Sequence, residues 1–304
     1  MKKPACLLLI LALVLSLSVL ASKARILNFS PPPKVNYTMI TTTERLQITP
    51  GERQVDSTII VSNHTLEKSN SGYVLHTKFT SQRSLRNGRS LDNPLELIFA
   101  SLETSMDITA EGFASGINGY EKLPAVIDSI FPPDTAGALK SALSVEEMSA
   151  REVGEWNGRA ANLVDRVVSL DSKITDTAFY LMPEGASQKY YILSRLMDTL
   201  RLQGKWCVQT KITAATSPKE LASISGLSLK AIVDLFHIPD TVLQRYPAGR
   251  GVMRLTTEML VEMETLLMRS EKTVREIEYG FEVDSTGSRY LGKSVETRAV
   301  RYQY

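Results

Sequence analysis

Residues 35–48 read VNYTMITTTERLQI, and the first part of this stretch alternates between apolar and polar side chains. Val35, Tyr37 and Met39 occupy every second position, so in an extended chain they share one face. The remainder is rich in threonine and isoleucine, whose branched side chains pack well on a pleated surface. The stretch is therefore predicted to be a half-buried β-strand.

The segments that follow continue the strand pattern. Pro50-Gly51 marks a turn, a strand is predicted over residues 56–66, and a turn at residues 69–72 leads to a strand over 73–80. Short turns between neighbouring strands favour antiparallel pairing. Further strands are predicted over residues 161–182, 205–214, 276–283 and 289–300.

Helical signals are confined to a few segments. Asn93-Pro94 offers a cap and a proline at the first helical position. Gly204 stands where a helix ending near residue 203 would need a glycine, and Ser217-Pro218-Lys219-Glu220 is a capping box. The predicted helical regions are residues 94–143, interrupted by two short strands about a turn at residues 110–112, then residues 187–203 and the hairpin 217–237. Residues 256–269 fit a helix or a strand, with the helix favoured.

These patterns predict an α+β fold, mainly antiparallel β-sheet in two halves with a few packed helices, after an N-terminal signal segment. The best candidate for a boundary between the halves is residues 144–154. The expected organisation is a β-rich domain with helices over residues 35–150 and a second α+β domain over residues 151–304.

The N-terminus has the three parts of a secretory signal. Lys2 and Lys3 precede an apolar run over residues 5–20, and small residues suited to signal peptidase place cleavage before Ser22 or before Arg25. The alternative is an uncleaved inner-membrane anchor over residues 5–21, a run at the short limit for crossing a bilayer. Either way the protein is expected to be exported to the periplasm or cell envelope of a bacterium.

A proline-rich segment separates this signal from the first strand. Residues 22–34 contain Pro31-Pro32-Pro33, which cannot join the interior of a sheet. We therefore expect a tether that acts as a spacer. Farther along, residues 78–89 carry a lysine and three arginines without an acid, and the interleaved polar residues favour a solvated loop over an anion-binding site.

Composition limits the classes of partner. Removal of residues 1–21 leaves 33 basic and 33 acidic residues, so the mature chain is formally neutral and lacks the basic surface of a nucleic-acid-binding protein. Cys207 would then be the single cysteine, in an alternating apolar run, and a buried, inert thiol is expected. No disulfide can form within such a chain.

No catalytic pattern stands out. His64, His76 and His237 lie in unrelated contexts without metal-ligand spacing, so no metal or other cofactor is predicted. Ser62 and His64 are close in sequence, but a serine hydrolase also needs an acid that nothing singles out. The alternative that two of the scattered acids form the carboxylate pair of a glycosidase is left open. A non-catalytic protein is favoured over an enzyme.

The most distinctive patch lies within residues 206–256, where Leu221, Gly226 and Ile232 fall at the spacing of two helices packed across a glycine turn. It resembles a helix-turn-helix, but the second helix presents few side chains for reading bases. It also resembles a LysM module, a strand-helix-helix-strand unit that binds N-acetylglucosamine-containing glycans such as peptidoglycan. That resemblance implies glycan contacts from two loops, at Thr216, Ser217, Ile238 and Asp240. A plain helical hairpin packed on the sheet is the alternative.

Two functions follow as expectations. The first is a cell-envelope protein that contacts peptidoglycan through residues 206–256. The alternative is a periplasmic carrier that encloses a lipid or another apolar ligand between strands and helices, which the neutral charge and the many Met and Leu residues favour. A hydrolase is the weaker third possibility.

Overall fold

The molecule is organised by antiparallel strands, described in a computed structural model for residues 24–49, 51–91, 95–169, 174–176, 179–180, 190–215, 250–283 and 288–304. The strands of the main sheet are β2 (Lys34–Thr49), β3 (Glu52–Lys68), β4 (Gly72–Arg86), β5 (Arg89–Leu91), β6 (Glu103–Thr109), β7 (Ala114–Asn118), β9 (Ile174–Asp176), β10 (Phe179–Tyr180), β11 (Tyr190–Leu202), β12 (Lys205–Ala215), β13 (Arg250–Glu262), β14 (Met268–Val283) and β15 (Ser288–Gln303).

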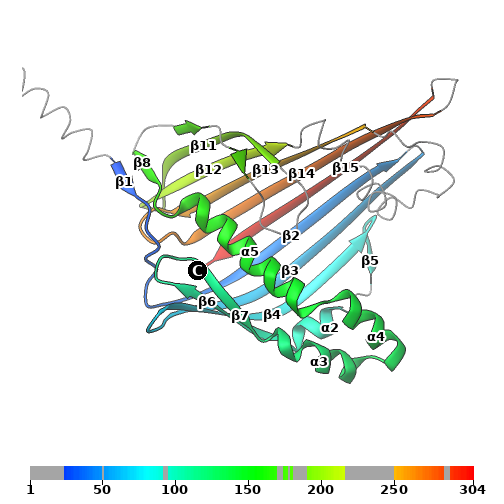
Figure 1. The fold of residues 1–304 in the computed structure, drawn as a ribbon, viewed down its shortest axis with the longest axis horizontal. Helices are drawn as coiled ribbons and strands as arrows, with labels where there is room; N and C mark the ends of the chain where they lie inside the picture. The colour runs from blue at the N-terminus through cyan, green and yellow to red at the C-terminus, as the bar shows by residue number, and fades with distance from the viewer. Residues whose placement is uncertain are drawn as a thin grey trace, which may run out of the picture.

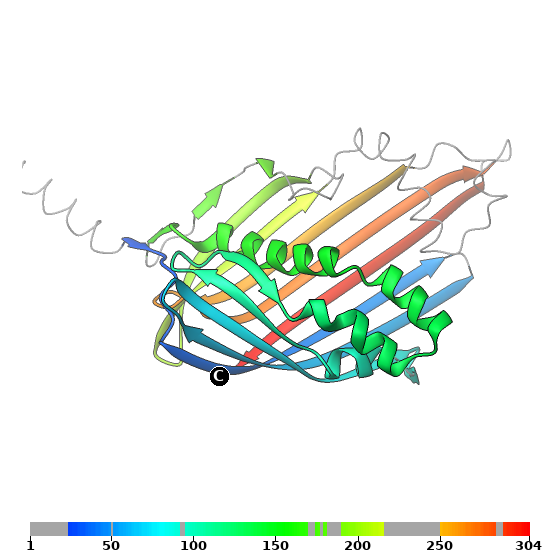
Figure 2. The same cartoon turned by 60° about the horizontal axis from the view of Figure 1, so that its bottom comes forward.

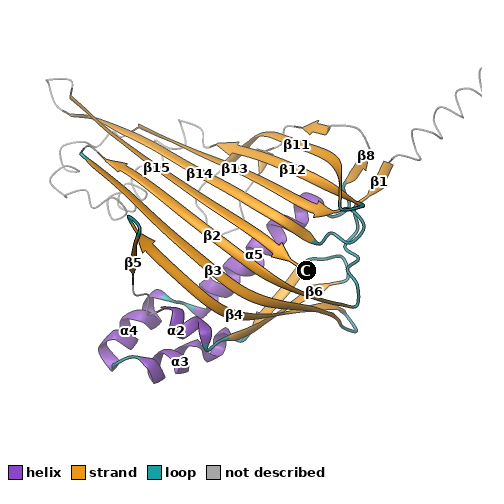
Figure 3. Ribbon diagram, turned by 180° about the vertical axis from the view of Figure 1, so that it is seen from behind, coloured by secondary structure: helices purple, strands orange, loops and turns teal. Residues whose placement is uncertain are grey.

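These strands form a single sheet in the order β10-β11-β12-β13-β14-β15-β2-β3-β4-β6-β7, with β5 on β4 and β9 on β11. The sheet is curved, and the helices lie on its concave side (Figures 1 and 2). Seen from behind, the long strands cover the helix that crosses the inner face (Figure 3). The prediction of a mainly antiparallel sheet with a few helices is confirmed, whereas residues 1–23 lie outside the described residues.

The first and the last long strands of the chain pair with each other in the middle of the sheet. β15 pairs with β2 from Lys293 opposite Ile48 to Gln303 opposite Thr38. Strands on both sides of the proposed boundary at residues 144–154 therefore belong to the same sheet. That boundary itself falls within α5 (Val145–Leu163), which begins where Ser144 Oγ accepts a hydrogen bond from the Glu147 amide.

The helix predicted over residues 187–203 is wrong, because β11 (Tyr190–Leu202) occupies most of this segment and pairs with β12 along its length. Gln203 and Gly204 both have positive φ, the conformation of a tight hairpin turn. The glycine that suggested a helix end therefore closes a β-hairpin. Pairing with the neighbouring strand outweighs the high helix propensity of the long side chains in this segment.

The helix favoured over residues 256–269 is wrong for the same reason. This segment is the second part of β13, followed by a turn and the start of β14. Thr257 and Thr273 face each other across these two strands with their hydroxyls 3.2 Å apart. Residues 78–89 are likewise not a loop: they extend β4 and form β5, and Lys78 and Arg86 pair with Glu103 and Asp56.

The helices predicted between residues 94 and 143 are confirmed as α2 (Leu95–Ala100), α3 (Leu123–Ile130) and α4 (Pro133–Ala142). The short η1 (Tyr120–Lys122) lies directly before α3. They pack on one another around Ile98, Leu123 and Ile127, which are fully buried. The proposed cap Asn93 lies outside the described residues. No helix of the described ranges is both long enough and apolar enough to cross a membrane.

The proline-rich tether is packed against the fold, contrary to the expectation of a spacer. β1 (Ala24–Ile26) pairs with β8 (Val167–Ser169), and Leu27 is fully buried. Phe29 packs edge-on against Tyr73 and Trp156. The two apolar residues just before the prolines thus anchor the segment, because their burial removes large side chains from water.

Candidate functional site

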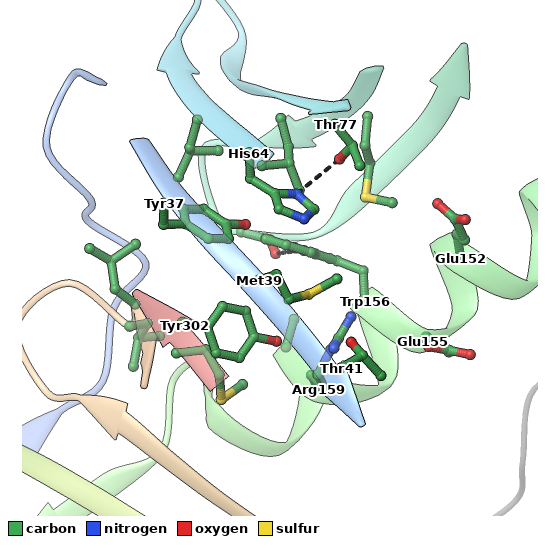
Figure 4. Close-up of a pocket in the computed structure, with 18 of the residues that line it drawn as sticks. Tyr37, Met39, Thr41, His64, Thr77, Glu152, Glu155, Trp156, Arg159 and Tyr302 are labelled. Atoms are coloured by element: carbon green, nitrogen blue, oxygen red, sulfur yellow. Dashed lines mark hydrogen bonds between the residues drawn. The ribbon is translucent and has the colours of Figure 1, made fainter. Parts of the chain in front are cut away.

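A cavity of about 470 Å³ lies between α5 and the concave face of the sheet. Strands β2, β3, β4, β6 and β15 form its floor, and α5 covers it (Figure 4). Its apolar wall consists of Phe29, Met39, Ile60, Leu66, Leu75, Met106, Ile117, Trp156, Ala160, Leu163, Val164, Leu266, Leu267 and Met268. The remaining wall is hydroxyl-bearing and charged side chains, so the space is apolar with a minority of polar groups.

The spacing of residues along α5 explains which side chains enter the cavity. Glu152, Trp156, Arg159 and Leu163 recur at intervals of three or four, so they lie on one face of the helix. All four line the cavity. A helical stripe here combines two apolar residues with one acid and one base, which gives the cavity roof a mixed character.

Uncharged hydrogen bonds fasten α5 to β7 and its preceding turn. Asn157 Oδ1 accepts from the Ala114 amide at 2.7 Å, and Asn157 Nδ2 donates to the Ala114 carbonyl at 3.0 Å. Trp156 Nε1 donates to the Gly112 carbonyl at 2.9 Å. Asn157 therefore acts as the next strand would, satisfying both backbone groups of Ala114.

Ion pairs fasten the opposite side of α5 to β14 and β15. Arg159 Nη1 donates to Glu271 Oε2 at 3.0 Å, and Arg298 Nη1 donates to Glu155 Oε2 at 3.0 Å. The Arg159–Glu271 pair is the more buried, with 24% and 9% of the two side chains exposed, against 34% and 41% for Arg298–Glu155. The two pairs place compensated charges along one edge of the cavity.

Aromatic rings from β2, β3 and the C-terminal end of the chain at β15 meet at one end of the cavity. Tyr37 stacks on His64, with ring centroids 4.8 Å apart and planes within 4°. Tyr302 and Tyr304 lie 5.7 and 5.3 Å from the Tyr37 ring. Burial raises the pKa of all three tyrosines, so their hydroxyls stay protonated and can donate hydrogen bonds.

His64 is buried and held by two hydroxyls. Ser62 Oγ lies 2.8 Å from Nε2, and Thr77 Oγ1 lies 3.0 Å from Nδ1. Burial, reinforced by the nearby Arg159, lowers the pKa of His64 to about 4, so the ring is neutral at ordinary pH. Ser62 does approach His64, but a threonine occupies the position where a hydrolase triad needs a carboxylate.

Glu152 is the second buried ionisable group of the roof. It accepts a short hydrogen bond from the Tyr120 hydroxyl. Burial raises the pKa of Glu152 despite that bond, and raises the pKa of Tyr120 as well. Burial thus disfavours the charged form of both groups.

The residues proposed from the LysM resemblance cannot be placed. Thr216, Ser217, Ile238 and Asp240 lie outside the described residues, as does most of the patch 206–256, so glycan contact stays a prediction. The parts of that patch the structure describes are the strands β12 and β13. Cys207 is buried as predicted, and burial raises the pKa of its thiol.

Of the histidines, His64 lines the cavity and His76 is exposed on the neighbouring strand, while His237 lies outside the described residues. Within the described ranges, no three His, Cys, Asp or Glu side chains are grouped as a metal site requires. Arg159, Glu271 and Tyr302 were missed by sequence reasoning. The helical stripe of α5 could have indicated Arg159, but β-pairing alone brings the other two beside it.

A scan of family models and a search of curated proteins find no match to this chain. Solved structures with some similarity include DynF from the dynemicin biosynthesis pathway of Micromonospora chersina, at 6% identity over 90% of this chain and 84% of that chain, with a TM-score of 0.17. OccK5 (OpdH) of Pseudomonas aeruginosa matches at 7% identity over 91% and 100%, with a TM-score of 0.22. The loop L8 deletion mutant of OmpT, an outer membrane protein of Vibrio cholerae, matches at 8% over 89% and 100%, with a TM-score of 0.18. Similarities this low carry no argument about fold or function.

Proposed function

We propose that this protein binds a lipid-sized apolar or amphipathic ligand in the cavity beneath α5 and carries it in the cell envelope without catalysing a reaction on it. The observation that carries the proposal is the cavity itself, about 470 Å³ of space with a mainly apolar wall. Small-molecule sites commonly measure about 300–1,000 Å³ and combine apolar walls with a few placed polar groups.

An apolar wall favours contact with an apolar ligand over contact with water. Met39, Leu75 and Met106 line the cavity, and Leu75 and Met106 also belong to a buried apolar cluster. Water in this space would find few partners, since most of the wall offers no hydrogen-bonding group. A ligand with an apolar body would make dispersion contacts with that wall.

Export is part of the proposal. Lys2, Lys3 and the apolar run over residues 5–20 support delivery to the periplasm or cell envelope, either free or held by that segment. Cell fractionation of the full chain tests this: recovery in the cytosol would contradict it. Peptidoglycan contact through residues 206–256 stays a separate proposal, to be tested by co-sedimentation with purified sacculi.

The ligand-binding proposal is tested with two neighbouring alanines of α5. Ala160 lines the cavity, whereas Ala161 is exposed on the other face of the helix. Native mass spectrometry of protein from cells expressing the full chain, purified without detergent, should show an added mass that organic solvent removes. Ala160→Phe fills the space and should abolish that mass.

Ala161→Phe adds the same ring outside the cavity and should retain the bound mass. Circular dichroism and thermal unfolding establish that both variants are folded. A folded Ala160→Phe protein that binds as much ligand as the wild type would contradict a site beneath α5. Absence of any added mass, together with no binding of supplied acyl lipids, would contradict the function.

A further inference from the structure

The cavity has one polar end, and its chemistry narrows the class of ligand if the proposed function holds. This end consists of Tyr37, Thr41, Arg159 and Tyr302, which line the cavity from β2, α5 and β15. In Figure 4 the hydroxyl of Tyr37 points into the cavity, and the hydroxyl of Tyr302 points toward Arg159 and Thr41. Several hydrogen-bond donors thus face one region of a mainly apolar space.

The two tyrosine hydroxyls are available to a ligand. Within the described part of the chain, hydrogen bonds satisfy His64 through Ser62 and Thr77, but neither Tyr37 nor Tyr302 has a hydrogen-bond partner for its hydroxyl. Both hydroxyls are open to the cavity, since among the described residues Thr210 Oγ1 is the one fully buried side-chain polar atom without a partner. Covering such a donor with a ligand that offers no acceptor is costly, and acceptor atoms on the ligand would satisfy it.

The charges at this end are already compensated. Arg159 is paired with Glu271, and Arg298 with Glu155, so two positive groups face two negative ones. His64 is neutral, and Glu152 is a carboxyl group, which adds no positive charge in either protonation state. The remaining charged residue of the wall, Arg151, is exposed. A ligand bearing a full negative charge would therefore meet no uncompensated buried cation.

We infer that the ligand's polar end is an uncharged hydrogen-bond acceptor, of the kind an ester or amide carbonyl provides, rather than a free carboxylate. The donors Tyr37 and Tyr302 fit a carbonyl oxygen, and Arg159 can add an N–H donor besides the one that it gives to Glu271. A free carboxylate would lose much of its hydration without gaining a new counter-ion. The apolar wall accommodates the acyl chain.

Two probes that share one acyl chain separate the alternatives. Binding of monooleoylglycerol and of oleate to the full-length protein is measured at pH 8 by isothermal titration calorimetry, below the concentration at which either probe aggregates. Monooleoylglycerol is expected to bind at least about tenfold more tightly than oleate. Oleate binding as tightly or more tightly would overturn the inference while leaving the proposed function standing. Binding of neither probe would overturn both.

Tyr37→Phe and Tyr302→Phe remove only the hydroxyls. Each is expected to weaken monooleoylglycerol binding by about 2- to 12-fold, the range for one net hydrogen bond. Binding of pyrene, an apolar probe without an acceptor, should be unchanged. Equal losses for both probes would mean that the hydroxyls act through the shape of the cavity, and would contradict the inference.

Glu271→Gln keeps the shape of the side chain but removes the charge that compensates Arg159. The variant should shift preference toward oleate by several-fold or more, since an uncompensated guanidinium can then pair with a carboxylate. Glu278→Gln is the matched control, because Glu278 lies on the same strand and pairs with Lys293 on an exposed surface. An unchanged preference in a folded Glu271→Gln protein would contradict the account of the charges.

Discussion

The two sides of α5 are held by different physical means. Toward β7, Trp156 and Asn157 make uncharged hydrogen bonds to backbone groups. Toward β14 and β15, Arg159 and Glu155 make ion pairs with side chains. Hydrogen bonds between neutral groups depend little on salt or pH, whereas ion pairs respond to both. The attachment of α5 to β7 should therefore change little with salt or pH, whereas salt and pH can weaken its attachment to β14 and β15.

The largest effect is expected from Arg159→Met, which leaves Glu271 without its partner. Because 9% of the Glu271 side chain is exposed, its unpaired charge would be poorly solvated. Removing one member of such a pair should lower the free energy of unfolding by about 3 kcal/mol. Urea denaturation measures it. A loss below about 1 kcal/mol would mean that this pair behaves like an exposed one.

The next largest loss of stability is expected at acid pH, where His64 becomes protonated. Its pKa falls from 6.5 when unfolded to about 4 when folded, so its contribution is fully present above pH 6.5 and is lost as pH falls through about 4. The loss should be on the order of 2–3 kcal/mol. Glu152, whose pKa is raised, changes stability with pH in the opposite sense.

His64→Gln isolates this term, because glutamine keeps hydrogen-bonding capacity but does not titrate in this range. The difference in unfolding free energy between wild type and variant should narrow steadily from pH 7 to pH 4. A difference that stays constant over this range would show that His64 does not couple folding to pH.

A loss of about 2 kcal/mol is expected from Asn157→Ala, since it leaves the backbone N–H and C=O of Ala114 unpaired. This loss should not change between low and high salt. Asn118→Ala serves as a control, because Asn118 Nδ2 donates to Asp107 Oδ2 at 3.4 Å on an exposed part of β6 and β7. Equal effects of the two substitutions would contradict the view that Asn157 fastens the helix to the sheet.

The smallest effect is expected from Glu155→Gln. The Arg298 and Glu155 side chains are 34% and 41% exposed, so water screens the attraction between them. The loss should be below about 1 kcal/mol and should vanish in high salt. Thermal unfolding at two salt concentrations tests this. A loss as large as that of Arg159→Met would remove the distinction between the two pairs.

Local patterns in the sequence predicted the strands that carry the cavity floor. Val35, Tyr37 and Met39 alternate, and β2 follows. The burial of Cys207 was predictable on the same grounds. Where helix-forming residues occur in strands, as in β11 and β13, the pattern misled, because pairing with neighbouring strands outweighed local propensity.

The site itself depends on contacts that no local pattern reveals. The spacing of Ser144 and Glu147 indicates the start of α5, and the spacing of Glu152, Trp156 and Arg159 indicates one face of that helix. Its position over the sheet arises from pairing between β15 and β2, more than 200 residues apart in sequence. Pairings between such distant segments are set by the whole fold, so Tyr302 could not be assigned to the site in advance.

The central claim, that a ligand's acyl chain lies beneath α5, is tested most directly by fluorescence quenching. The chain has two tryptophans, and Trp156 lines the cavity whereas Trp206 does not. Trp206→Phe leaves Trp156 as the emitter, and Trp156→Phe leaves Trp206. A monoacylglycerol with a brominated acyl chain should quench Trp156 strongly and saturably, and Trp206 weakly. Equal quenching of both, or quenching of Trp206 alone, would contradict a binding site beneath α5.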